Sequence, residues 1–87
     1  MKLNGVFVVK QIAGTYYAVP TGKTATQMKC MIKLNETAAF LFEKAQDGAD
    51  EDALVRTLIE KFGIEENTAR ADVFDFISTL KGANILE

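Results

Sequence analysis

The first third of the chain has the pattern of short β-strands. Residues 6–12 and 15–19 are rich in β-branched and aromatic side chains, and the dipeptide Ala13-Gly14 separates them. Residues 20–23 have the composition of a turn, because proline restricts φ and glycine tolerates positive φ. A third strand is expected over residues 27–34. The spacing predicts a meander of three short antiparallel strands.

The predicted strand over residues 27–34 alternates with a period of two, which places successive side chains on opposite faces. One face is apolar and is expected to pack on the core. The other carries lysines and is expected to point outward. The core-facing set is Met28, Cys30, Ile32 and Leu34, and the outward set is Lys29, Met31 and Lys33.

From Asn35 onward the apolar residues recur with the period of an α-helix. Asn35 and Asp50 are predicted helix N-caps, and Gly63 is predicted to end the second helix in a left-handed conformation. Gly82 is predicted to end a third helix that begins near residue 65. The predicted core residues are Ala38, Leu41, Phe42 and Ala45, then Leu54, Val55, Leu58, Ile59 and Phe62, then Val73, Phe76, Ile77 and Leu80, with Ile85 and Leu86 folding back on the core.

These elements predict an α+β fold in which a three-stranded antiparallel sheet is followed by three helices. The strands are expected within about residues 5–34 and the helices within about residues 36–82. The second and third helices, joined by a glycine turn, have the spacing of a helix-turn-helix. With the strands in front, the arrangement resembles a winged helix-turn-helix. The length of 87 residues suits a single domain over residues 1–87.

Composition excludes most familiar catalytic centres. The chain has one cysteine and no histidine, so it cannot form an internal disulfide, a His/Cys zinc site or a Ser-His-Asp triad. No phosphate-binding glycine motif is present. Cys30 is expected to be a small buried hydrophobe, because no cationic partner or CxxC spacing accompanies it. We therefore expect a non-catalytic binding module without a cofactor or a metal.

The charge is divided along the chain. Residues 1–35 contain five lysines and no acid, a formal charge of +5, and residues 36–87 contain twelve acids and five bases, a formal charge of −7. This division predicts a positive and a negative face, which are either solvated surface or a means of steering a ligand. No secretory signal and no membrane-spanning run is recognised, so we expect a cytoplasmic protein.

An ordered set of segments resembles the PqqD family. Residues 34–42 (LNETAAFLF) are similar to the family block LN-x-(T/S)-A-x-x-(I/L)-(W/F). Residues 48–54 (GADEDAL) are similar to its acidic helix start, and residues 62–64 (FGI) stand at its Y-x-V turn. Residues 69–76 (ARADVFDF) and 80–86 (LKGANIL) are similar to its third helix and closing segment. The resemblance covers about residues 27–87.

Two positions depart from the family pattern. Phe42 stands where the family usually has tryptophan, a change that keeps an apolar side chain. The closing glycine is Gly82, and Ala83 and Asn84 then precede Ile85. This spacing leaves the end of the third helix open.

The resemblance implies a specific role. Members of this family recognise precursor peptides of ribosomally made, post-translationally modified products. They bind the leader segment and present it to a modifying enzyme, often a radical SAM protein. The resemblance implies that the leader lies as an added strand beside the third strand and the third helix. We expect a monomer or a weak homodimer, since an exposed sheet edge can also pair two copies.

The candidate peptide-binding residues come from two elements. The outward face of the third strand contributes its lysines and a methionine, and one flank of the third helix contributes side chains at helical spacing. Phe74 is either an exposed anchor or a second-face core residue, and the lysines either attract acidic leader residues or deter aggregation at the edge. The candidates are Lys29, Met31, Lys33, Arg70, Phe74, Ile77 and Lys81.

Two other functions remain as alternatives. A winged-helix DNA-binding regulator is disfavoured, because residues 65–82, its recognition helix, carry four acids against two bases. A structural adaptor that docks on an enzyme without touching the leader is compatible with the sequence.

Overall fold

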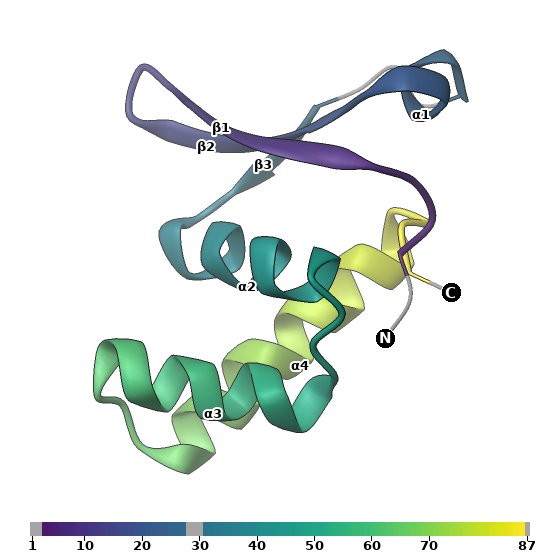
Figure 1. The fold of residues 1–87 in the computed structure, drawn as a ribbon. Helices are drawn as coiled ribbons and strands as arrows, with labels where there is room; N and C mark the ends of the chain where they lie inside the picture. Colours follow the sequence, from purple (N-terminus) through teal and green to yellow (C-terminus); the bar gives the residue numbers. More distant parts are fainter. Residues whose placement is uncertain (1–2, 28–30, 87) are drawn as a thin grey trace.

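The computed structural model describes residues 3–27 and 31–86. In these ranges three strands and four helices follow one another (Figure 1). The elements are β1 (Phe7–Ile12), β2 (Thr15–Pro20), α1 (Gly22–Gln27), β3 (Ile32–Leu34), α2 (Glu36–Gln46), α3 (Glu51–Phe62) and α4 (Glu66–Gly82).

The strands form one antiparallel sheet in the order β1-β2-β3, which confirms the predicted meander. The turn between β1 and β2 consists of Ala13 (φ 51°) and Gly14 (φ 82°). Positive φ at both positions is typical of a type I′ turn, whose twist matches that of a hairpin. β3 pairs with β2 over only three residues and lies at the edge of the sheet.

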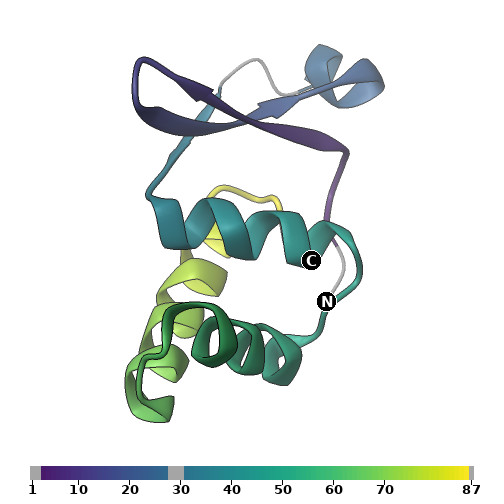
Figure 2. The same cartoon turned by 60° about the vertical axis from the view of Figure 1, so that its left-hand side comes forward.

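The helices cover one face of the sheet. α2 lies across this face, and α3 and α4 lie on the far side of α2 (Figures 1 and 2). The two ends of the described chain meet beside this layer, where Leu3 forms a bridge with Leu86. Ile85 and Leu86 are buried, as predicted.

Phe42 joins the layers. Its side chain is fully buried, and its ring meets Phe7 of β1 edge to face, with centroids 5.4 Å apart. On its other side it meets Phe76 of α4 in the same geometry, at 6.4 Å. Such aromatic pairs add to the free energy of burial. The position that departs from the family pattern thus keeps a central packing role.

Three predicted helix ends are confirmed, the start of α2 and both ends of α3. The Asn35 side chain accepts a hydrogen bond from the Ala38 N–H (2.7 Å), and Asp50 accepts one from Ala53 (2.8 Å). Gly63 ends α3 in the left-handed region, with φ at 65°. These three residues satisfy backbone groups that a helix leaves unpaired at its ends.

Two predictions for the second half of the sheet are wrong. Residues 22–27 form helix α1, where a turn and the start of a strand were expected, so the described chain has four helices rather than three. β3 begins only at Ile32. The short polar segment GKTATQ forms a helical turn that is held by local hydrogen bonds, such as that from the Thr26 hydroxyl to the Lys23 carbonyl, and this local bonding overrode the expected turn and strand. The predictions for Met28, Lys29 and Cys30 fall outside the described residues.

The last helix ends at Gly82, within the predicted bounds, but Gly82 is its last helical residue and does not form the expected stop beyond the helix. The residue with positive φ is Asn84, at 64°. Asparagine tolerates this region better than other side chains, which explains how the chain turns back without a glycine there. The predicted core residues Ala38, Ile59, Phe62 and Ile77 are half-buried, and the others within the helices are buried.

Two phenylalanines provide a matched test of this packing. We expect Phe42→Ala to lower the free energy of unfolding by about 3–5 kcal/mol, because it leaves a cavity between the sheet and α4. Phe74→Ala, at a side chain that is 65% exposed, should change it by less than about 0.5 kcal/mol. Urea denaturation of both variants measures the difference. Equal losses would show that Phe42 does not carry the interlayer contact.

Candidate functional site

The hydrogen bonds next to β1 establish which backbone N–H and C=O groups of β1 and β2 point toward the neighbouring strand and which point away from it. Val6 accepts a hydrogen bond from the Thr21 N–H (3.0 Å). The Phe7 N–H instead turns away from β2 and donates to the Gln46 side chain (2.9 Å). Phe7 lies opposite Pro20 and Lys10 lies opposite Tyr17. Hydrogen-bonded and non-bonded pairs alternate along an antiparallel ladder, so the pair of Lys10 and Tyr17, three positions beyond the non-bonded pair at Phe7, is hydrogen-bonded. Tyr17 therefore directs its N–H and C=O toward β1.

The same alternation determines which backbone groups of β3 point toward β2 and which point away from the sheet. Tyr16 and Ala18 direct their backbone groups toward β3, where they face Leu34 and Ile32. Lys33 lies between these two, so its N–H and C=O point away from the sheet. Within residues 3–27 and 31–86, no backbone hydrogen bond is made on that side of β3. The sheet therefore ends in an open donor and acceptor at Lys33.

A hollow of about 250 Å³ lies beside this edge, between β3, α2 and α4. Its apolar lining includes buried side chains such as Leu34, Leu41 and Phe76. The lining residues come from the end of β3 and the following turn (Lys33, Leu34, Asn35), from α2 (Thr37, Ala38, Leu41) and from α4 (Asp72, Asp75, Phe76, Thr79, Leu80).

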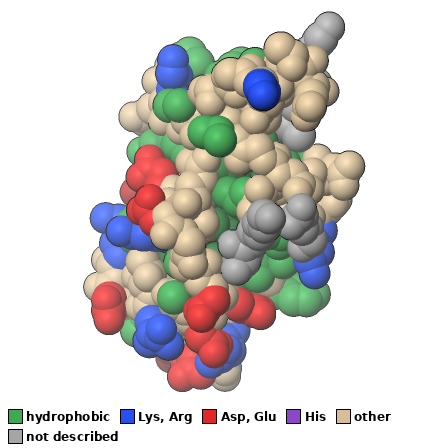
Figure 3. Space-filling view, turned by 45° about the vertical axis from the view of Figure 1, so that its right-hand side comes forward, with side chains coloured by type: hydrophobic (Ala, Val, Ile, Leu, Met, Phe, Trp, Pro, Cys, Tyr) green, Lys and Arg blue, Asp and Glu red, His purple; other side chains and the backbone are tan. Residues whose placement is uncertain are grey.

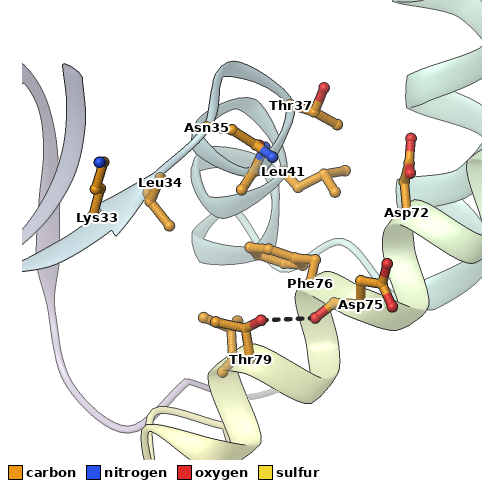
Figure 4. A pocket seen from close by; sticks show the side chains of 11 residues that line it. Lys33, Leu34, Asn35, Thr37, Leu41, Asp72, Asp75, Phe76 and Thr79 are labelled. Atoms are coloured by element: carbon orange, nitrogen blue, oxygen red, sulfur yellow. Dashed lines mark hydrogen bonds between the residues drawn. The ribbon is translucent and has the colours of Figure 1, made fainter.

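The close-up view shows how the walls face one another (Figure 4). Leu34 extends from β3 toward the hollow, whereas Lys33 extends to the opposite side of the strand. Asp72, Asp75 and Thr79 follow one flank of α4, and the Thr79 hydroxyl donates to the Asp75 carbonyl (2.9 Å). The hollow thus has an apolar floor and an acidic wall, with an open backbone edge on the other side.

The charges of the whole molecule divide along the same line. The charged side chains visible over the sheet in Figure 3 are lysines, and the acidic side chains lie over the helices. Lys33 is exposed on the sheet side of the hollow, and Asp72 and Asp75 lie on the helix side. The division predicted from the sequence therefore runs across the site itself. It also places acids on the helix that DNA binding would use, where phosphate contacts need bases.

Two of the residues predicted on the third strand lie at or next to the open edge of the sheet, and their role in peptide binding stays a prediction. Met31 is 51% exposed and directly precedes β3, and Lys33 is exposed at the open edge. Lys29, the third residue predicted on this face, falls outside the described residues.

The four residues predicted on α4 do not line the hollow. Arg70, Phe74, Ile77 and Lys81 occupy the side of the helix roughly opposite to Asp72, Asp75 and Thr79, given 100° per residue. Phe74 is exposed, which decides between the two alternatives for its packing, and Ile77 is half-buried against the core. Their role in peptide binding stays a prediction, without geometric support from this hollow.

Arg70 is engaged with neighbouring carboxylates. Its Nε donates to Glu66 (2.9 Å), and Asp52 lies 3.6 Å away. The hydrogen bond and the charge of Glu66 are the main causes that raise the pKa of Arg70, and Asp52 adds to them. Arg70 is thus a fixed cation that links α3 and α4, on the side of α4 away from the hollow.

Asp72, Asp75 and Thr79 were missed by the sequence analysis. They form an i, i+3, i+7 row along one border of the core stripe of α4. The predicted residues Arg70, Phe74, Ile77 and Lys81 form a similar row along its other border. Both rows mix charged and uncharged residues, and no local signal distinguishes them. The choice follows from how α4 rotates when Val73, Phe76 and Leu80 are buried.

The described part of the chain offers neither a cluster of metal ligands nor a membrane-spanning helix. Residues 3–27 and 31–86 contain no group of three or more His, Cys, Asp or Glu side chains placed to hold a metal. Among the helices of these same ranges, none has the length and apolar character required to cross a bilayer.

Fold and site together define an α+β domain with an open sheet edge beside an apolar groove. The family model for "Coenzyme PQQ synthesis protein D (PqqD)" matches residues 24–86. The chain belongs to this family, which confirms the resemblance found in the sequence.

One solved structure shares the fold. It is "TbiB1 in Complex with the TbiA(beta) Leader Peptide", with a TM-score of 0.75 and 16% sequence identity over 100% of this chain and 95% of the other. At this identity the likeness concerns the fold alone. The comparison with curated proteins gave no match.

The cap at Asn35 fixes the corner between β3 and α2, and it can be tested separately. We expect Asn35→Ala to lower the free energy of unfolding by about 1 kcal/mol, because the Ala38 N–H loses its acceptor. Asp50→Ala, which removes the equivalent cap of α3, should cost a similar amount. Hydrogen exchange by NMR should show faster exchange at Ala38 in the first variant and at Ala53 in the second. An unchanged Ala38 amide in Asn35→Ala would contradict the assignment.

Proposed function

We propose that this domain binds the leader segment of a precursor peptide as an added strand on β3. The observation that carries the proposal is the open N–H and C=O of Lys33 at the edge of the hollow. Strand addition requires such an edge together with pockets for alternate side chains. Family membership and the similar fold of a protein solved with a leader peptide support the same function.

The energetics require both parts of the site. A micromolar complex needs about −8 kcal/mol. Each hydrogen bond at the edge contributes about 0.5–1.5 kcal/mol net, so the two groups of Lys33 supply only part of this. Burying one apolar side chain of the peptide adds about 1.5–3 kcal/mol. The floor formed by Leu34, Leu41 and Phe76 is therefore as important as the edge.

The domain acts by binding and leaves the chemistry to a partner. A modifying enzyme, such as a radical SAM protein, receives the leader that the domain holds. This role requires no cofactor on the domain itself. We keep the cytoplasmic location expected from the sequence as part of the proposal.

A proline at the open edge separates backbone pairing from side-chain effects. We expect Lys33→Pro to weaken leader binding about tenfold or more, because it removes the outward N–H and no bond to β2. Lys33→Ala is the matched control, since it loses the charge and keeps the N–H. Titration of each variant with a fluorescent leader peptide of a candidate precursor gives the affinities, and thermal melting confirms folding.

The outcomes distinguish strand addition from the adaptor alternative. Normal binding by a folded Lys33→Pro variant would contradict strand addition. If the unmodified domain binds no leader at high micromolar concentration but binds the modifying enzyme tightly, the adaptor function is correct. Saturable binding with amide shifts along β3 supports the proposal.

Phe74 tests the other flank of α4. Because Phe74 does not line the hollow, we expect Phe74→Ala to bind the same leader with an affinity within about twofold of the unmodified domain, well inside the 1.4 kcal/mol of a tenfold change. The same titration measures it. A large loss of affinity in a stable variant would place the peptide across the flank that contains Arg70, Phe74, Ile77 and Lys81.

A further inference from the structure

Neither Asp72 nor Asp75 forms an ion pair within the described residues, and Lys33, which also lines the hollow, extends to the opposite side of β3. Asp72 is half-buried and Asp75 is exposed, and both line the hollow on α4. The ion pairs of the described residues all involve Arg70, on the other side of the helix. Two carboxylates three residues apart on one helix face repel each other, so a cation near both is favoured.

An added strand on β3 presents its two faces to different surroundings. Its side chains alternate, so every second residue points toward the hollow and α4. These residues meet the apolar floor and the wall with Asp72 and Asp75. The residues between them point to the outer face of the sheet, on the side where Lys33 extends. The two faces of the bound peptide therefore meet charges of opposite sign.

We propose that the peptide recognised here carries an apolar residue and a lysine or arginine two positions apart, both on the face that meets α4. The apolar side chain fills the hollow, and the cation pairs with Asp72 and Asp75. This inference rests on the proposed function and specifies the peptide's chemistry. It assigns no part to the bases of α4, Arg70 and Lys81, because they lie on the flank opposite to the hollow.

Selection from a random library tests this preference without knowledge of the natural peptide. A display library of random 12-residue peptides is panned on the complete chain and on an Asp72→Asn/Asp75→Asn variant. The unmodified domain should enrich peptides with an apolar residue and a Lys or Arg at spacing two. The variant should enrich the apolar residue without the cation, because the neutral wall no longer attracts charge.

A matched variant controls for net charge. Glu51→Gln/Glu60→Gln removes two exposed carboxylates of α3 that do not line the hollow. Its selected peptides should match those of the unmodified domain. For one enriched peptide, the double aspartate variant should bind about five- to twentyfold more weakly, and the control within twofold.

Salt dependence supplies a readout that needs no variant. The affinity of the unmodified domain for the enriched peptide should fall between 50 and 500 mM NaCl, because salt screens partly exposed pairs. The same peptide with Gln in place of its Lys or Arg should show a smaller change.

Each contrary result has a defined meaning. Enrichment of acidic residues, or equal enrichment of cations on the Asp72→Asn/Asp75→Asn variant, overturns the inference and leaves strand addition intact. Failure to enrich any peptide on the unmodified domain overturns the proposed function and this inference with it. Equal salt dependence of the Lys and Gln peptides also overturns the inference.

Discussion

The packing of Phe42 between the sheet and α4 is the contact on which the site depends. Its ring lies edge to face with Phe7 on one side and Phe76 on the other. Phe76 also forms part of the floor of the hollow, so the same contact joins the layers and positions one wall of the groove. Because interiors are densely packed and relax only partly, truncating Phe42 leaves a cavity between β1 and α4 and removes the contact that holds Phe76.

The candidate site combines an open backbone edge with an apolar side-chain groove. β3 is only three residues long, and it presents a single outward N–H and C=O pair, that of Lys33. Such a short edge limits unwanted pairing between copies. In the proposed binding mode, the edge gives a visiting strand its register and the hollow supplies the specificity, through its apolar floor and the carboxylates of Asp72 and Asp75.

Local signals predicted much of the fold. The caps at Asn35 and Asp50 and the left-handed Gly63 follow from the chemistry of helix ends, and all three are confirmed. The predictions failed where local preferences were weak. Residues 22–27 formed a helix despite an expected turn and strand, and Asn84 took the position expected for Gly82. The residues predicted on α4 lie on the flank that does not line the hollow, and the role of the predicted residues in peptide binding stays a prediction.

The sequence by itself determined the order of the three strands and of the helices α2, α3 and α4, the core-facing stripes, the family and the absence of histidine chemistry. These properties depend on residue identity and on spacing within one element. Only the tertiary structure decided which flank of α4 faces β3 and which backbone groups of β3 are open. The flank of α4 that faces β3 depends on how α4 rotates to bury Val73 and Phe76. The open backbone groups of β3 depend on which residues of β1 and β2 form the hydrogen-bonded pairs of the sheet. Both are relations between elements, which a pattern within one segment does not contain.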